Sequence, residues 1–310
     1  MMTGQGRRSL ANVAAAVALA LVAGACGSGG SAGGTAGTPP AVTTRQVKAV
    51  TERDFDRGNF SNSAQVSNQW LPLAPGTQFL LEGRANRGRG RLPHHVVLTV
   101  TDLTKTIDGV RSLVLWDRDY NEGQLVEAEL AFHAQDDDGN VWNLGEYPEE
   151  YENGKFQGAP STWLAGLAGA KAGIVMRADP QAGTSRYLQG YAPKVDFSDV
   201  AKVLKTGQRS CIPLRCYENV LVIDESNPYE PGAHQLKYYA PGVGNIRVEP
   251  VGGEEKEVLV LVKVTHLSAP ALARARAEAL KLDKRAYAVT RDLYRQTPPA
   301  ERALQAGQSP

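Results

Sequence analysis

The sequence has little cysteine and lacks several motifs that mark enzymes. Its 310 residues contain three cysteines, fewer than the four ligands of a structural zinc site. The nucleophile motif G-x-S-x-G, the zinc motif H-E-x-x-H and a glycine-rich phosphate loop after a strand are all missing. These absences argue against a structural zinc protein, a hydrolase and a nucleotide-dependent enzyme.

An excess of basic charge is missing as well. Without residues 1–25 the chain has 32 basic and 33 acidic residues. Proteins that bind nucleic acids usually carry a clear basic excess, so we expect no nucleic-acid partner. Beyond the first 25 residues, no apolar run is long enough to span a membrane.

The first 25 residues are typical of an export signal. Arg7 and Arg8 form a charged start, residues 10–22 are apolar, and small residues lead to Cys26. The end of this segment, VAGAC, resembles the lipobox of bacterial lipoproteins, except that Ala23 stands where leucine is usual. This resemblance implies a lipid on Cys26 that anchors the protein to the outer side of the cell membrane. A plain secretory signal cut nearby is the alternative.

A flexible tether is expected over residues 26–50. Most of it consists of Gly, Ser, Ala, Thr and Pro without an apolar pattern, so it cannot bury enough surface to offset the entropy of ordering. A tether directly after Cys26 suits a lipid anchor. The folded part then divides into a β-rich domain, residues 51–268, and a helical C-terminal segment, residues 269–310.

Two cysteines remain after Cys26. Cys211 and Cys216 are separated by four residues that include Pro213, which fits a turn. In an exported protein an even remainder of cysteines favours a disulfide. We therefore predict a bond between Cys211 and Cys216.

Short strand patterns alternate with turn signals from residue 70 onward. We expect strands over residues 77–84, 94–102, 110–120, 184–191, 217–225, 235–239, 245–250 and 256–266. Residues 195–204 have the spacing of a short helix, and residues 163–173 form either a loop or a helix. The pattern predicts a mainly β fold, an antiparallel open barrel or strongly curved sheet with a C-terminal helix.

The C-terminal helix is expected within residues 271–297, which contain no Gly or Pro. Ser268 can cap its start, with Pro270 in the first turn. One apolar stripe keeps its phase along the segment, which favours a single helix that packs on the β domain over a partner-binding helix. The stripe consists of Leu272, Ala275, Ala279, Leu282, Ala286, Val289 and Leu293.

The central hairpin holds the densest set of reactive groups. Residues 125–135 alternate with period two, residues 136–139 form an Asp-rich turn, and residues 140–147 return until Pro148 stops the strand. If Gln135 pairs with Asn140, one face carries four candidate ligand-binding residues, with Trp142 and Leu144 among them. These four residues are Glu127, Glu129, His133 and Glu146.

Carboxylates beside one imidazole can serve as general acid and base, or bind a divalent cation through Glu129, His133 and Glu146. The alternative is a solvated outer face of the hairpin. The two readings differ in one respect: inward-facing acids should have shifted pKa values. His234 and Lys237, which precede a Pro-Gly turn, are further candidates for a ligand pocket.

Two segments resemble a known group of proteins. The motifs AQDDDGNVWNLGE and KYYAPGVGN are similar to those of an uncharacterised family of exported bacterial β-rich lipoproteins, over roughly residues 70–265. The resemblance implies a shared fold and cellular address and brings no activity with it.

The function that the sequence favours is binding rather than catalysis. We expect an exported, lipid-anchored protein that holds a small molecule, a lipid or a cation beside the central hairpin, because curved β-sheets close around such cavities. The alternatives are an envelope enzyme that uses carboxylate and histidine chemistry, and a structural envelope protein.

Overall fold

The structure is a computed structural model that describes residues 14–15, 19–20, 55–86, 90–229, 232, 234–252 and 256–303. Two short strands near the N-terminus, β1 (Ala14–Ala15) and β2 (Leu19–Ala20), pair antiparallel with each other. The rest of the expected signal segment, Cys26 and the tether lie outside the described residues.

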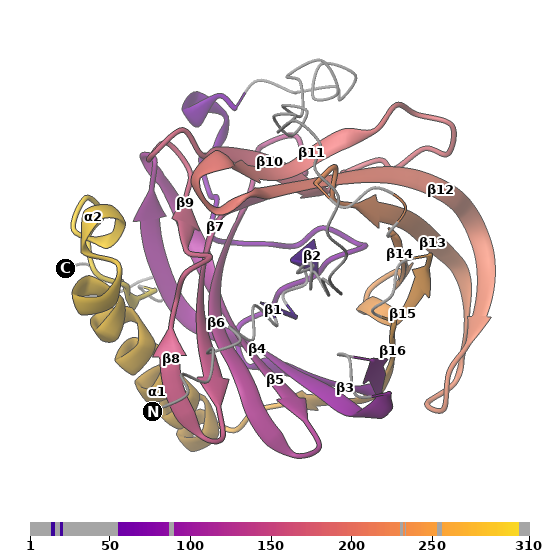
Figure 1. Cartoon of the computed structure of the whole chain (residues 1–310). Coiled ribbons are helices and arrows are strands. Elements are labelled where there is room, and N and C mark those ends of the chain that lie inside the picture. The colour runs from indigo at the N-terminus through magenta and orange to yellow at the C-terminus, as the bar shows by residue number, and fades with distance from the viewer. Residues whose placement is uncertain are drawn as a thin grey trace, which may run out of the picture.

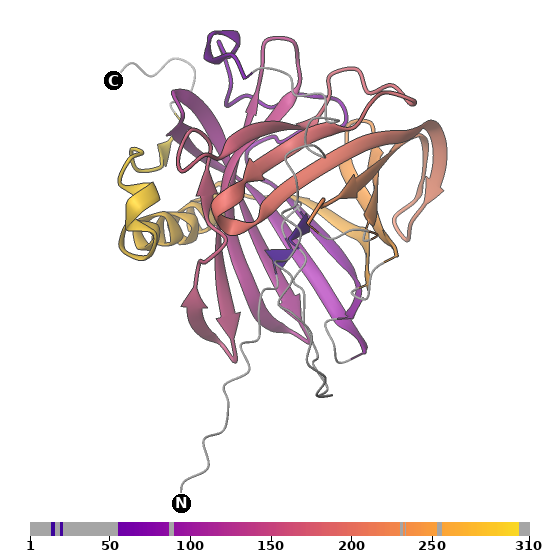
Figure 2. The same cartoon turned by 45° about the horizontal axis from the view of Figure 1, so that its top comes forward.

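Twelve strands of the described part form a closed antiparallel barrel, and helices α1 (Ala269–Val289) and α2 (Arg291–Tyr294) lie on its outside (Figures 1 and 2). The mainly β, antiparallel fold with a C-terminal helix is therefore confirmed. The barrel strands, which neighbour each other in sequence order, are β3 (Thr77–Asn86), β4 (Arg91–Ile107), β5 (Val110–Asn121), β6 (Gln124–Gln135), β7 (Val141–Glu152), β10 (Lys171–Met176), β11 (Tyr187–Ala192), β12 (Phe197–Cys211), β13 (Cys216–Ser226), β14 (His234–Ala240), β15 (Gly244–Val251) and β16 (Lys256–His266).

The barrel closes where β7 pairs with β10. Ile174 of β10 lies opposite Trp142 of β7. Further along β7, the short strand β9 (Trp163–Leu164) pairs at Gly145, where an added Cβ would come within 2.5 Å of the Trp163 carbonyl oxygen. Glycine at position 145 therefore permits the close approach of β9. Outside the ring, β8 (Lys155–Gly158) pairs with the end of β7, and β17 (Glu301–Arg302) pairs with β4.

Both faces of the wall formed by β4 to β7 are buried. Outside, α1 contacts β4 and β6, the Tyr147 ring lies 5.2 Å from that of Tyr294, and Leu130 lies opposite Tyr147. Because strand residues alternate between faces, the odd-numbered residues of β6 point to the barrel interior. Two short 3-10 helices, η2 (Arg57–Asn59) and η3 (Pro193–Val195), lie in the connecting segments.

Two sequence predictions about the strands are wrong. Residues 195–204 belong largely to strand β12, where Val203 pairs with Ile223 of β13; long-range pairing overrides the local helical spacing. Strand β7 also continues past Pro148, which lies opposite Glu129. On its other side, β7 pairs with β9 at Gly145 and Glu146 and with β8 from Glu150 onward. Pro148 lies between these two pairings, so neither of them needs its missing N–H.

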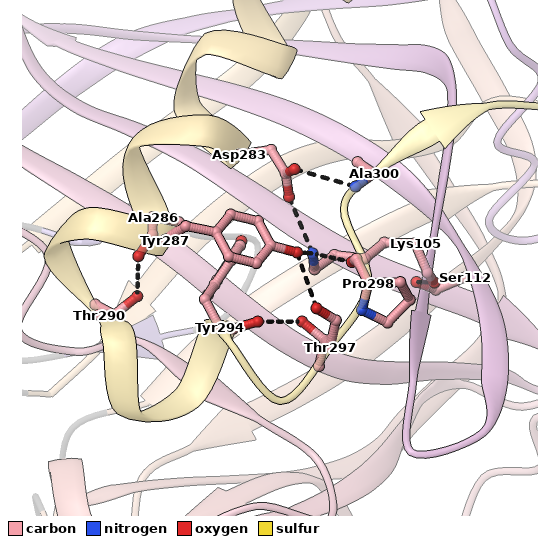
Figure 3. Close-up of polar contacts among 10 residues, drawn as sticks. All are labelled: Lys105, Ser112, Asp283, Ala286, Tyr287, Thr290, Tyr294, Thr297, Pro298 and Ala300. Carbon is pink, nitrogen blue, oxygen red and sulfur yellow. Dashed lines mark hydrogen bonds and ion pairs between the residues drawn. The ribbon is translucent and has the colours of Figure 1, made fainter.

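The expected single C-terminal helix is interrupted at Thr290. Its backbone has φ −117° and ψ 53°, and its hydroxyl donates to the carbonyl of Ala286 (3.1 Å; Figure 3). The break turns α2 so that Tyr294 is fully buried between the rings of Tyr147 and Tyr287. Ser268 is the N-cap residue, although its side chain makes no capping hydrogen bond. Neither described helix has the length and apolar character required to cross a membrane.

The predicted disulfide is confirmed. Cys211 ends β12 and Cys216 begins β13, and the two residues lie opposite each other and are bonded. The bond closes the hairpin over a four-residue loop in which the Ile212 amide donates to the Arg215 carbonyl.

A buried lysine fastens the C-terminal segment to the barrel (Figure 3). The Nζ atom of Lys105 on β4 lies 3.0 Å from Asp283 Oδ1 of α1, 3.1 Å from the Tyr287 hydroxyl and 2.7 Å from the Pro298 carbonyl. The other oxygen of Asp283 accepts from the Ala300 amide (3.0 Å). Lys105 and Asp283 are almost completely buried, so each depends on the other for charge compensation.

We expect the variant Asp283→Ala to lower the free energy of unfolding by about 3–5 kcal/mol, because it leaves the Lys105 ammonium buried without its carboxylate. The double variant Lys105→Met/Asp283→Leu should recover most of this loss, since it removes both charges. Urea unfolding followed by circular dichroism measures both effects. The exposed pair of Lys281 and Glu278 supplies the control: Lys281→Ala should cost less than about 1 kcal/mol. A double variant as unstable as Asp283→Ala would contradict the role of the pair.

Candidate functional site

The structure brings the four hairpin residues together inside the barrel. Glu129 and His133 of β6 and Glu146 of β7 line one small internal cavity. Glu127 is two residues before Glu129 on the same strand, and it is 2% exposed. The acids are therefore buried inside the barrel, and the solvated outer face is excluded for them.

The hairpin register differs from the expected one. Gln135 pairs with Val141, and after an irregularity Ala131 lies opposite Glu146. This second pairing is shifted by two residues from the expected register, and a shift of two keeps each residue on its face. Trp142, expected among the acids, lies opposite Ala134, and its ring is 5.3 Å from that of Phe55.

Strand β5 adds two acids that the sequence analysis did not select as site residues. Asp117 lies opposite Glu129, and Asp119 lies opposite Glu127. We call these four residues the lumen acids. Each is at most 2% exposed, and like charges in directly opposed positions destabilise a sheet. The alternation of β5 is the signal that could have identified Asp117 and Asp119, once β5 was paired with β6.

Compensation of these carboxyl groups is incomplete: Arg118 lowers the pKa of Asp117 by its charge and its backbone amide, whereas the neighbouring charges of Glu127 and Glu129 all raise their pKa values. Burial is the main cause that raises the pKa values of Asp117, Glu127 and Glu129 well above their usual range, and neighbouring carboxylates raise them further. Within the described part of the chain, both carboxyl oxygens of Asp117 and the Oε2 atoms of Glu127 and Glu129 are buried without a hydrogen-bond partner. Buried carboxyl groups of this kind are either protonated or ionised beside a bound cation.

The cavity between the acids has a volume of about 10 Å³, roughly the space of one water molecule. Its lining consists of Leu115, Asp117, Glu129, Ala131, His133, Asn143, Glu146 and Val175. The Nδ1 atom of His133 is buried and has no hydrogen-bond partner among the described residues. Burial lowers the pKa of His133 to about 4, so its ring is neutral at pH 7 and offers an unprotonated nitrogen.

Two hydrogen bonds hold the carboxylate of Glu146 in place at the cavity. Its carboxylate accepts from Asn143 Nδ2 (2.6 Å) and Trp163 Nε1 (3.1 Å). Burial raises the pKa of Glu146 to about 6, while these hydrogen bonds and the charge of Lys237 limit the rise. Lys237 itself is buried and lies 2.6 Å from Glu225. Of the two candidates on β14, Lys237 thus influences the cavity through its charge on Glu146, although it is not one of the lining residues.

His234 lies elsewhere. It is three residues from Lys237 on the same strand and hence on the opposite face. Its Nδ1 atom is 2.8 Å from Asp224, and the side chain is partly exposed. The structure therefore separates His234 from the cavity.

His94, at the other end of the lumen acids, is the functional candidate that sequence reasoning passed over. Its Nε2 atom lies 2.7 Å from Glu257, and its Nδ1 atom lies 3.1 Å from Asp119. Burial alone would lower the pKa of His94, but the contact with Glu257 and the charge of Asp119 raise it to about 9. His94 is thus an internal cation at pH 7 and compensates Asp119, whereas its neighbour His95 stacks on Tyr120.

Metal coordination has no prepared site in the described part of the chain: no group of three or more His, Cys, Asp or Glu side chains there is arranged to hold a metal ion. The assignment of a divalent cation to Glu129, His133 and Glu146 stays a prediction.

Comparison with known proteins gives distant structural similarities. No protein-family model matches the chain, and no curated protein matches it. A candidate exported protein with a YmcC-like fold from Bacteroides fragilis is 12% identical with a TM-score of 0.36, and the match covers 64% of this chain and 99% of the other. A candidate lipoprotein from Parabacteroides distasonis is 13% identical with a TM-score of 0.38 and the same coverage.

A third solved structure, a β-barrel-like protein of a domain of unknown function from Brucella abortus, is 11% identical with a TM-score of 0.31, and the match covers 62% of this chain and 98% of the other. At such identities a shared ligand does not follow.

The two internal histidines should titrate on opposite sides of neutrality. At pH 7 we expect His94 to be protonated and His133 to be neutral, since their pKa values are about 9 and about 4. The stability that His94 contributes as a cation is present below its unfolded pKa of about 6.5 and is lost as the pH rises through about 9. Imidazole nitrogen NMR shifts across a pH series measure both rings.

The variant Asp119→Asn is the internal control for this titration. It should lower the pKa of His94 because it removes one neighbouring charge, and it should leave the ring of His133 neutral at pH 7. A neutral His94 at pH 7 in the unchanged protein would contradict the described contacts.

Replacing one lumen acid by its neutral analogue should stabilise the protein at alkaline pH. Because the folded state raises the pKa of Glu129, the stability linked to its proton is present at low pH and is lost as the pH rises through the folded pKa. Glu129→Gln should therefore raise the melting temperature more at pH 8 than at pH 5, by about 2–4 °C for each kcal/mol gained. Glu152, exposed at the end of β7, provides the control variant Glu152→Gln. Equal effects of Glu129→Gln at both pH values would refute the shift.

Proposed function

We propose that this protein binds an ammonium-type cation in the acid-lined interior of its barrel, at the outer side of a bacterial membrane. The observation that carries the proposal is the direct opposition of Asp117 and Glu129 across β5 and β6, with carboxyl oxygens that lack hydrogen-bond partners among the described residues. A positive charge between the two strands would replace this repulsion by attraction.

The size of the cavity supports an ammonium group. A volume of about 10 Å³ accommodates one water-sized group, and an ammonium head is of that size. Metal ions need oxygen or nitrogen ligands at about 2.0–2.6 Å, and the described residues contain no group of three placed for this. This supports an ammonium head, held by N–H···O contacts, over a coordinated metal ion.

The donors and acceptors also match. A primary ammonium group has three N–H donors and no acceptor. Asp117 and Glu129 supply carboxyl oxygens from adjacent strands, and neutral His133 supplies an unprotonated nitrogen. Glu146, fixed by Asn143 and Trp163, adds a further carboxylate at the cavity.

The cellular location is proposed from the sequence. The apolar start, the lipobox-like residues before Cys26 and the low-complexity segment after it support an exported protein with a lipid anchor and a tether. A tethered binding body at the membrane surface suits capture of small solutes outside the cell.

Titration calorimetry with methylammonium chloride tests the proposal on the chain without residues 1–25. We expect binding at pH 8 that Asp117→Asn weakens about tenfold to a hundredfold, since one charge-assisted hydrogen bond contributes about 1.5–3 kcal/mol. Glu152→Gln, remote from the cavity, should bind as the unchanged protein does.

Native mass spectrometry with metal analysis decides between an ammonium group and a metal. A co-purified metal that is lost in Glu129→Ala or His133→Ala would overturn the ammonium proposal in favour of a metal site. Absence of any methylammonium binding at millimolar concentration would overturn it as well.

A further inference from the structure

A second candidate site lies on the outside of the barrel, where the apolar stripe of the C-terminal helices runs past the sheet. Ala279 and Ala286 of α1 are fully buried, but Val289 at the end of the helix is 38% exposed. Leu293 of α2 continues the stripe and is only partly buried. The last part of the stripe is therefore not covered by the barrel in the described structure.

A groove of about 460 Å³ follows this uncovered part. One wall is the junction of α1 and α2, and the other is formed by the segment around β9 and by η3. Its volume falls in the range of small-molecule sites, which are mostly apolar with a few polar groups. The large apolar side chains of its lining are Trp163, Leu164, Leu167, Val195, Val289 and Leu293, of which Trp163 and Leu164 are almost completely buried.

Positively charged residues outnumber negatively charged ones in the lining of the groove. Lys194 of η3 and Arg291 of α2 are exposed at the groove, and Asp292 is the single acid among its described lining residues. No ion pair of the described part involves Lys194 or Arg291, in contrast to Arg285, whose Nη1 atom lies 2.7 Å from Glu149. An apolar groove with free cations beside it is complementary to a molecule with an apolar tail and an anionic head.

We propose that this groove binds a free long-chain fatty acid. The hydrocarbon tail lies along Leu167, Val289 and Leu293, and the carboxylate pairs with Lys194 or Arg291. The tail contributes through burial of apolar area, and affinity rises about fourfold for each methylene group that the groove covers. Trp163 lines the groove and donates to Glu146, but no described residue lines both the groove and the cavity beside Glu146, so the two proposed sites do not overlap.

Calorimetric titration of the chain without residues 1–25 with laurate, below its micelle concentration, tests the tail contact. Val289→Asp should weaken laurate binding at least about tenfold, because the new carboxylate lies in the groove and repels the ligand. Val264 on β16 is 39% exposed and lies outside the groove lining, so Val264→Asp is the matched control and should bind laurate normally. Equal binding by both variants would overturn the proposal.

The head-group contact is tested with charge variants and a second probe. Lys194→Glu should weaken laurate binding several-fold, whereas Lys205→Glu on β12 should not, and dodecyltrimethylammonium should bind less tightly than laurate. Binding of both amphiphiles with equal affinity would overturn the anionic preference. Attachment to phosphatidylglycerol vesicles without any binding of free laurate would assign the groove to the membrane surface and overturn the fatty-acid site.

Discussion

Closure of the sheet between β7 and β10 is the constraint on which the other features depend. In an open sheet the odd-numbered residues of β6 would face solvent, whereas in a closed barrel they face an enclosed interior. The helix α1 then covers the outer side of β4 and β6. Period-two alternation consequently places Leu130 against the helical segment and Glu129 inside the barrel. Next to the closing pair of strands, glycine at position 145 permits the close approach of β9 to β7.

Much of this organisation could be predicted from the sequence, and the reasons for the rest are specific. Alternation over residues 125–135 placed Glu127, Glu129 and His133 on one face, because alternation is a local property, and the assumed pairing of Gln135 with Asn140 added Glu146 to that face. The register of the hairpin depends on an irregularity between Ala131 and His133. No local sequence pattern predicts this irregularity. The inclusion of Asp117 and His94 required the pairing of β4, β5 and β6, and the lengthening of β12 depended on pairing with β13. Long-range pairing decided each of these positions.

The interior and the exterior of the barrel use charge in different ways. Outside, Lys105 and Asp283 compensate each other and also bond the Tyr287 hydroxyl, the Pro298 carbonyl and the Ala300 amide, so the buried charges join three segments (Figure 3). Inside, Asp119 has His94, but Asp117 and Glu129 face each other beside a neutral histidine. Groups left uncompensated in this way reduce stability unless a ligand supplies the missing charge, which is typical of functional sites rather than structural ones.

On the proposed function, the acids of the barrel interior exchange their protons for a cation. Calorimetric titration with methylammonium at pH 7 in phosphate and in HEPES, two buffers that differ in heat of ionisation and contain no primary ammonium group, measures this exchange. We expect heats that differ between the buffers in the direction of proton release, because carboxyl groups with raised pKa values must ionise when the cation binds. The difference should shrink in the Asp117→Asn/Glu129→Gln variant. Binding with identical heats in both buffers would show that no proton is released and would rule out this exchange.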